Sequence, residues 1–231
     1  MDRTASLHLK LLDGLENLTL RELMDVFSMR YSPELGYGFV NSEIIEAGVA
    51  STLVYESTYY KRIFDPSSAK FTSEKLLEYQ EVSLIYHLAD GVLQCNAGGR
   101  KLDKVLSIIS QLFDNDITVI DIFVNISDII DALTKSKLIF KILGFNIQNY
   151  RSQVGLHGKF MARVTEQNIA ISIINEYGAE ITDIAIEILT DFGAVVWKLS
   201  PHGRIVVRTD ENILEEQVGI ARNIVIECNN A

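Results

Sequence analysis

The chain has 231 residues, 48% of them hydrophobic, which suits one globular domain or two small ones and excludes a disordered chain. Its net charge of −10 repels phosphate backbones at long range, which argues against non-specific nucleic-acid binding but leaves room for a local basic face. The first residues lack a signal peptide's apolar core, and charges interrupt every apolar stretch well before the ~20 residues that span a bilayer, so we expect a cytoplasmic protein without membrane contact.

Residues 1–40 have a mixed pattern and are expected to form a partly helical N-terminal appendage. Thr19 and Glu22 match a capping box at the start of a helix. The helix over 20–28 has an apolar stripe that must be buried, either in its own domain or against another subunit or a different partner, which would give a homodimer or a component of a complex. The stripe consists of Leu20, Leu23, Met24 and Phe27.

Residues 41–150 are expected to form a first α/β half. β-branched and aromatic residues predict a strand over 48–64, and 70–80 is ambiguous between helix and strand. A hairpin with "ADG" at its turn and an amphipathic helix follow. Further elements are a strand over 117–124, a helix over 127–135 with Ser127 as a possible N-cap, and a strand over 137–145.

Residues 151–231 are expected to form a second α/β half, which begins after the boundary candidate "NIQNYRSQVG". Alternating and helical apolar patterns predict its elements in turn. The strands are expected over 157–164, 181–189, 194–200 and 204–209, and the helices over 166–177 and 212–226.

The two halves repeat a pattern at a constant offset of 112 positions. Gly91 corresponds to Gly203, and the strand and helix phases after each glycine agree. Two copies indicate a duplication within one fold, although independent use of a common hairpin–helix unit is an alternative. The expected fold class is α+β, with a pseudo-duplicated, curved antiparallel sheet that carries helices on one face.

Period-two counting places basic residues together on one face of the second half's sheet. These candidate ligand-binding residues are Lys159, Arg163, Lys198, Arg204 and Arg208. Asp183 and Glu187 share the face, so ordinary solvation with cross-strand ion pairs is one interpretation. The other interpretation is a binding face for an anionic ligand.

Duplicated halves with curved antiparallel strands and a closing helix resemble the fold of the TATA-box-binding-protein family. The motifs "DGVLQCNAGGRKLDKV" and "HGRIVVRTDENILEEQV" are similar in outline to the family's glycine turn, short apolar strand and helix. The resemblance covers roughly residues 48–225. It implies the fold but not the family's DNA-kinking site, because Tyr86 and Trp197 are not at the matching positions, and the fold also serves protein–protein scaffolds.

The loop Asn96–Lys101 is the sharpest local motif, because it runs from a strand into a helix. It contains Gly98, Gly99, Arg100 and Lys101, and such a turn can point backbone N–H groups at an anion. A tight turn is the alternative. As a functional site, the loop would make the protein a small-anion or nucleotide sensor, or a weak hydrolase.

Motifs of established chemistry are missing from the sequence. His157 and His202 precede glycines at strand starts, where turn chemistry explains them. Cys95 and Cys228 lack zinc-ligand spacing, so we expect two thiols, with one disulfide as the alternative. We therefore expect that the protein is not an enzyme and holds no cofactor or metal. We expect instead a binding or regulatory protein that uses its sheet face for DNA or a partner protein.

Overall fold

The computed structural model describes residues 2–151 and 157–229. By their internal contacts the residues form two compact units, which are unit 1 (1–11 and 120–231) and unit 2 (12–119). The expected α+β class is confirmed, with five α-helices and eleven strands in the described part of the chain. None of the described helices is long and apolar enough to cross a membrane. The division expected from the sequence, into residues 1–40, 41–150 and 151–231, differs from these two units and stays a prediction.

The beginning of the chain is a strand that the sequence analysis did not identify within the mixed and partly helical segment 1–40. Strand β1 (Asp2–Asp13) pairs antiparallel with a strand near the C-terminus, from Asp2↔Asp210 to His8↔Arg204. Leu7 and Leu9 alternate into the core, which is the pattern of a half-buried strand. Sequence reasoning missed β1 because its partner is far away in the chain.

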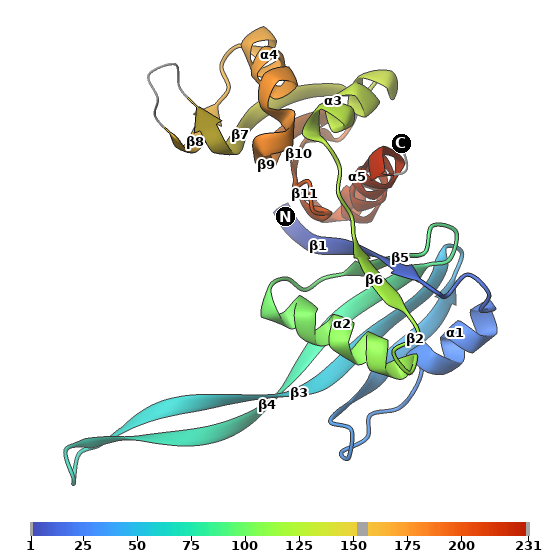
Figure 1. The fold of residues 1–231 in the computed structure, drawn as a ribbon, viewed down its shortest axis with the longest axis vertical. Coiled ribbons are helices and arrows are strands. Elements are labelled where there is room, and N and C mark those ends of the chain that lie inside the picture. Colours follow the sequence, from blue (N-terminus) through green and yellow to red (C-terminus); the bar gives the residue numbers. More distant parts are fainter. Residues whose placement is uncertain (1, 152–156, 230–231) are drawn as a thin grey trace. The chain divides into compact units, whose positions relative to one another are not determined.

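Unit 2 has two helices on one face of an antiparallel sheet (Figure 1). Leu23 and Phe27 of the first helix are buried in this unit's own core, so the apolar stripe does not need another subunit. The capping box between Thr19 and Glu22 is confirmed. The elements are α1 (Leu20–Phe27), β2 (Tyr37–Ile45), β3 (Gly48–Asp65), β4 (Lys70–His87), β5 (Val92–Cys95) and α2 (Arg100–Leu112), with sheet order β2-β3-β4-β5.

Strands β3 and β4 form an unusually long hairpin. They pair without interruption from Gly48↔His87 to Asp65↔Lys70, so the ambiguous segment 70–80 is a strand. Strand β2 accompanies β3 only as far as Tyr55. The rest of the hairpin is a two-stranded arm that projects beyond the sheet of unit 2 (Figure 1).

Unit 1 has the remaining three helices, and its sheet order is β1-β11-β10-β9-β7-β8. The helix expected over 127–135 begins one residue earlier, with Asn125 rather than Ser127 as its N-cap. The elements are β6 (Thr118–Asp121), which starts at the end of unit 2, α3 (Ile126–Lys135), β7 (Ile139–Arg151), β8 (His157–Arg163), α4 (Gln167–Tyr177), β9 (Ile181–Thr190), β10 (Gly193–Leu199), β11 (Arg204–Asp210) and α5 (Leu214–Asn229).

The two units follow a common element order once β8 and α4 are set aside. Each has a helix, four antiparallel strands in sequential sheet order and a closing helix. In each, a glycine with positive φ precedes the last strand, Gly91 at 64° and Gly203 at 71°. The carbonyl of each accepts a hydrogen bond from β1, Leu12 N at 2.8 Å and Leu9 N at 2.9 Å. The repeated glycine turn therefore anchors β1 in both units.

Candidate functional site

The sheet of unit 1 has an inner face under its helices and an outer face opposite. Ile186, Trp197 and Val207 lie side by side on β9, β10 and β11, and all three are fully buried on the inner face. Residues between them in the alternation point the other way. The five basic residues that period-two counting placed there are exposed, and their role in ligand binding stays a prediction. We call this surface the outer face of unit 1.

The outer face of unit 1 carries more positive charge than sequence counting found. Lys141 of β7 lies on it as well, directly opposite Glu187 in the ladder. Sequence reasoning missed Lys141 because it assigned the strand over 137–145 to the first half, whereas β7 pairs with β9 in this sheet. The six basic residues are Lys141, Lys159, Arg163, Lys198, Arg204 and Arg208, against the carboxylates Asp183, Glu187 and Asp210.

Ion pairing uses only part of this charge. Lys198 Nζ lies 3.8 Å from Asp183 Oδ1, a partly exposed pair that contributes little to stability. In the part of the chain that the structure describes, Lys159, Arg163 and Arg204 form no ion pair. All three side chains are exposed on strands β8 and β11. Ordinary cross-strand pairing therefore does not account for the whole cluster.

Two hollows lie on the outer face, where β7 is irregular beside β8 and β9. The larger has a volume of about 560 Å³, and Lys159 and Met161 line it. The smaller, of about 150 Å³, is lined by Lys198 and Arg204. Both include Asn146, Thr182 and Asp183, and Asn146 Nδ2 donates to Asp183 Oδ2 at 2.7 Å. This arrangement offers cations and neutral polar groups to a bound ligand, beside the Asp183 carboxylate.

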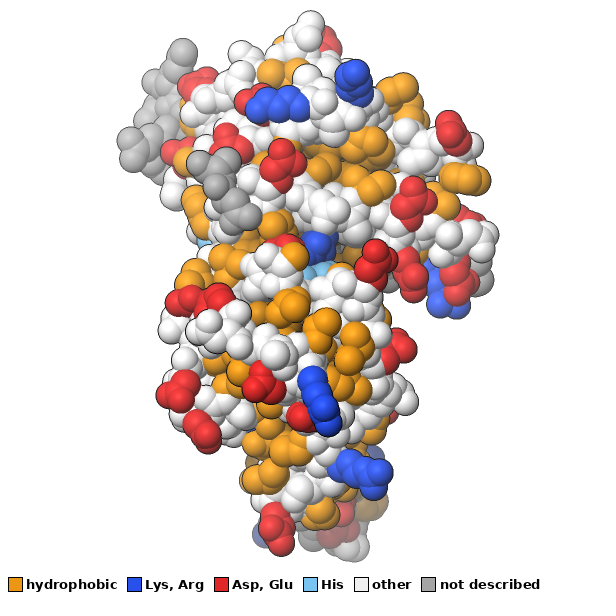
Figure 2. Space-filling model, turned by 90° about the vertical axis from the view of Figure 1, so that its right-hand side faces the viewer, with side chains coloured by type: hydrophobic (Ala, Val, Ile, Leu, Met, Phe, Trp, Pro, Cys, Tyr) orange, Lys and Arg blue, Asp and Glu red, His pale blue; other side chains and the backbone are white. Residues whose placement is uncertain are grey.

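Acidic side chains dominate elsewhere on the surface, as the charge of the chain requires. On the face drawn in Figure 2 they are widely spread, and basic side chains are few. The outer face of unit 1 thus has the opposite sign from most of the molecule. A surface of this sign concentrates anionic ligands close to it even when the whole protein is acidic.

The glycine loop of unit 2 is the turn that leads from β5 into α2. The Asn96 side chain accepts a hydrogen bond from Ser83 N at 2.8 Å, and this contact fixes the start of the loop. Gly99 is the N-cap of α2 at φ 53° with no side-chain cap. Gly98, Arg100 and Lys101 are exposed. A helix N-terminus alone does not identify a ligand, so anion binding here stays a prediction.

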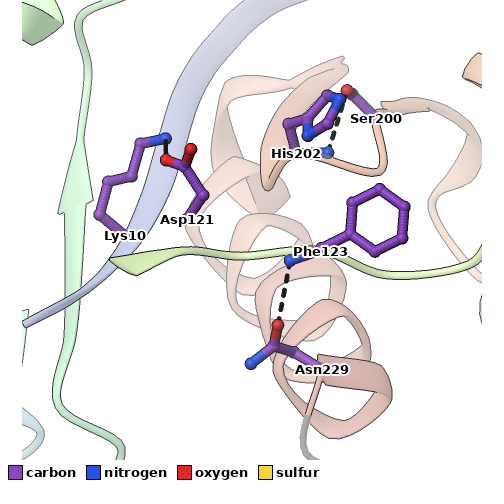
Figure 3. A network of polar contacts seen from close by, with 6 residues as sticks. All are labelled: Lys10, Asp121, Phe123, Ser200, His202 and Asn229. Carbon is purple, nitrogen blue, oxygen red and sulfur yellow. Dashed lines mark hydrogen bonds and ion pairs between the residues drawn. The ribbon is translucent and has the colours of Figure 1, made fainter. Parts of the chain in front are cut away.

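His202 lies in a structural network of unit 1 (Figure 3). Its backbone N–H donates to Ser200 Oγ at 3.3 Å, and its ring lies 5.6 Å from that of Phe123. Nearby, Lys10 forms an ion pair with Asp121. This hydrogen-bonded ammonium lowers the pKa of the Asp121 carboxyl. These contacts tie β1, β6 and the turn before β11 together, which is a structural role for the histidine.

Other candidate chemistry is sparse. The described residues contain no cluster of three side chains that could hold a metal ion. Cys95 and Cys228 are free thiols in the structure. The side chain of His157 lies outside the described part of the structure. No protein-family model matches the chain, and no curated protein matches it either.

Proposed function

We propose that the protein binds DNA through the outer face of unit 1 and catalyses no reaction on it. The observation that carries the proposal is the excess of basic over acidic side chains on this face of a chain whose net charge is −10. Lysine and arginine that neutralise phosphates release condensed counterions, and this release drives DNA binding. The general negative charge elsewhere disfavours contact through the acidic parts of the surface.

The composition between the charges also supports a nucleic-acid ligand. Ala185, Val196 and Val206 lie among the basic residues on β9, β10 and β11. These small and β-branched side chains protrude little from the sheet. A duplex can therefore approach the strands closely while the longer lysine and arginine side chains reach its phosphates. Arginine is well suited to that role because its guanidinium binds phosphate in a bidentate manner.

The element order of the two units supports the fold expected from the sequence. A helix, four antiparallel strands and a closing helix occur twice, with a positive-φ glycine at the same place. We propose an internal duplication of the kind found in the TATA-box-binding-protein fold. Fold alone does not choose a ligand, so the charge of the outer face carries the functional argument.

The test is fluorescence anisotropy with a labelled duplex over a series of salt concentrations. We expect Arg163→Gln combined with Arg204→Gln to weaken binding roughly 10- to 100-fold, because two charge-assisted contacts are lost. The slope of log K against log salt should become less negative by about 1.8, which corresponds to two phosphates. Circular dichroism checks that the variant is folded.

The matched control is Arg100→Gln combined with Lys101→Gln, which removes the same charge from the glycine loop of unit 2. We expect this variant to bind almost as the wild type does. If both double variants weaken binding equally, the outer face is not the site. If the wild type does not bind DNA at low salt, the proposal is wrong, and a protein partner becomes the better explanation of the face.

A further inference from the structure

The arm of unit 2 is the second surface with a distinctive chemistry. From Ser57 to Asp65, and from Lys70 to Glu78, only β3 and β4 are paired with each other. Nine residues at ~3.3 Å each give an arm of roughly 30 Å. Such a ribbon is long enough to reach across a nucleic acid, and two-stranded ribbons fit into the major groove of DNA.

One face of the arm collects exposed aromatic and aliphatic side chains. Alternation from Glu56 places this face on the outer side of the unit 2 sheet. Its exposed members are Tyr60 (70%), Phe64 (50%), Phe71 (57%), Leu77 (53%) and Tyr79 (56%). A water-exposed cluster of this size on a projecting element indicates a binding surface.

The charges of the arm are separated between its two faces. Arg62 and Lys75 lie on the same face as the aromatic rings. The distal part of this face, which begins at Tyr60 and its partner on β4 and ends at Phe64 and its partner, has no carboxylate. The opposite face holds Asp65, Glu74 and Glu78, with Lys70 opposite Asp65 and Lys61 opposite Glu74 in the ladder. The aromatic face of the arm therefore carries a net positive charge in its distal part. The opposite face has three carboxylates and two lysines.

The rings and cations are already arranged for stacking. Phe64 and Phe71 are cross-strand partners whose ring centroids lie 5.1 Å apart. The Arg62 guanidinium lies 4.1 Å from the centroid of Phe71, a cation–π contact. At the base of the arm, Glu56 accepts a hydrogen bond from the Tyr31 hydroxyl, so this carboxylate already has a donor.

We infer that the aromatic face of the arm binds unstacked bases of a nucleic acid, with Arg62 and Lys75 beside its phosphates. Aromatic rings provide a stacking platform for bases, and arginine adds cation–π and phosphate contacts. Packing the aromatic faces of two arms against each other would bring like charges together, which disfavours self-association. The inference rests on the proposed function and specifies it, because the preferred ligand becomes DNA with an unpaired segment.

The experiment compares three probes in anisotropy: an intact duplex, the same duplex with a short single-stranded gap, and heparin, which has anionic groups but no bases. The variant is Phe64→Ala with Phe71→Ala, and the matched control is Tyr59→Ala with Ile63→Ala on the opposite face of the arm. We expect wild type and control to prefer the gapped duplex. The phenylalanine variant should lose roughly 10-fold or more in affinity for it and little for heparin.

The outcomes separate this inference from the proposed function. If wild type binds DNA and the phenylalanine variant keeps the gap preference, the inference is wrong while the proposed function stands. If the phenylalanine variant loses the preference but Arg163→Gln with Arg204→Gln changes nothing, the inference stands and the outer-face proposal is wrong. Equal losses for DNA and heparin overturn base stacking. A change in sedimentation mass on mutating the phenylalanines, without DNA, assigns the arm to self-association and overturns the inference.

Discussion

The outer faces of the two sheets carry opposite charge on the same order of strands. In unit 2, the outer positions of the sheet proper include Glu43, Glu56 and Glu81, and the described strand residues there include no lysine or arginine before the arm begins. In unit 1, the equivalent face has six basic residues and the three carboxylates Asp183, Glu187 and Asp210. The inner faces of both are apolar and buried.

This comparison indicates that the inner residues of the strands determine the fold, whereas the outer residues determine which ligand the surface suits. Inner positions such as Leu53 in unit 2 and Ile186 in unit 1 are fully buried, and their burial sets the register of the strands. Outer positions are free to vary because changing them does not expose the core. We infer that DNA binding is confined to unit 1 and to the arm, although the strand order of both units is alike.

The largest effect we expect is loss of the core of one unit. Trp197 is fully buried on β10, and Trp197→Ala should destabilise unit 1 by about 3–5 kcal/mol. Hydrogen exchange followed by mass spectrometry measures this unit by unit. Peptides from β10 and β11 should lose protection, and peptides from β4 and β5 should keep it. An equal loss of protection in both sets of peptides would show that the two units unfold as one cooperative unit.

The two thiols give a chemical comparison, one in each unit. Burial raises the pKa of both Cys95 and Cys228 to about 11. At pH 8 the thiolate is then about 100-fold rarer than for a thiol with a pKa of 9, so reaction with a disulfide reagent should be slow and rise about tenfold per pH unit. Cys95 is fully buried and should react more slowly than Cys228. Chain unfolded in urea is the control, and equally fast reaction before and after unfolding would contradict the burial.

The paired glycines test how closely the two turns correspond. Both have positive φ, which costs alanine about 1 kcal/mol or more. A Cβ at Gly203 would lie 2.9 Å from Leu9 O, whereas a Cβ at Gly91 would lie 3.5 Å from Leu12 O. We therefore expect Gly203→Ala to cost about 2 kcal/mol and Gly91→Ala about 1 kcal/mol, measured by urea unfolding. The reverse order would mean that the turns differ in solution.

The smallest effects concern the first helix of each unit. Thr19 accepts from Glu22 N in α1, and Asn125 accepts from Ser127 N in α3. Replacing either N-cap by alanine should cost about 1 kcal/mol. Hydrogen bonds from the backbone and hydroxyl of Thr19 lower the pKa of Glu22, so the stabilisation by Glu22 is present above its ordinary pKa and is lost as the pH falls. Thr19→Ala should therefore matter less at acid pH, whereas Asn125→Ala should be insensitive to it.

Much of the fold follows from local sequence patterns. The strand alternation of β10 and β11 and the capping box of α1 are local signals, and the structure confirms them. The exposed basic side chains of the outer face follow from the same alternation. Each of these predictions needs only residues within one element, because burial of one face and the pleat of a strand are enough to place the side chains.

The features that were missed depend on partners distant in sequence. Strand β1 takes its register from β11, and no local pattern identifies that partner. Lys141 was missed because its strand was assigned to the first half, and only the pairing of β7 with β9 places it beside the other basic residues. The distal arm has no buried face at all, so residues 70–80 have neither a strand nor a helix signature. Pairing with 55–65 alone makes them a strand.

The pairing of β1 with β11 has a consequence for synthesis on the ribosome. The two strands are separated by roughly 200 residues, and at 5–20 residues per second the first strand waits roughly 10–40 s for its partner. Unit 2 has all its described elements available long before that. Strands β5 and β6, which also pair with β1, are made earlier, but the edge of β1 that pairs with β11 stays open during this interval, and an open strand edge invites association with other nascent chains. A slow-folding, chaperone-dependent phase during translation, absent when β1 is supplied as a separate peptide to a preformed remainder, would be its signature.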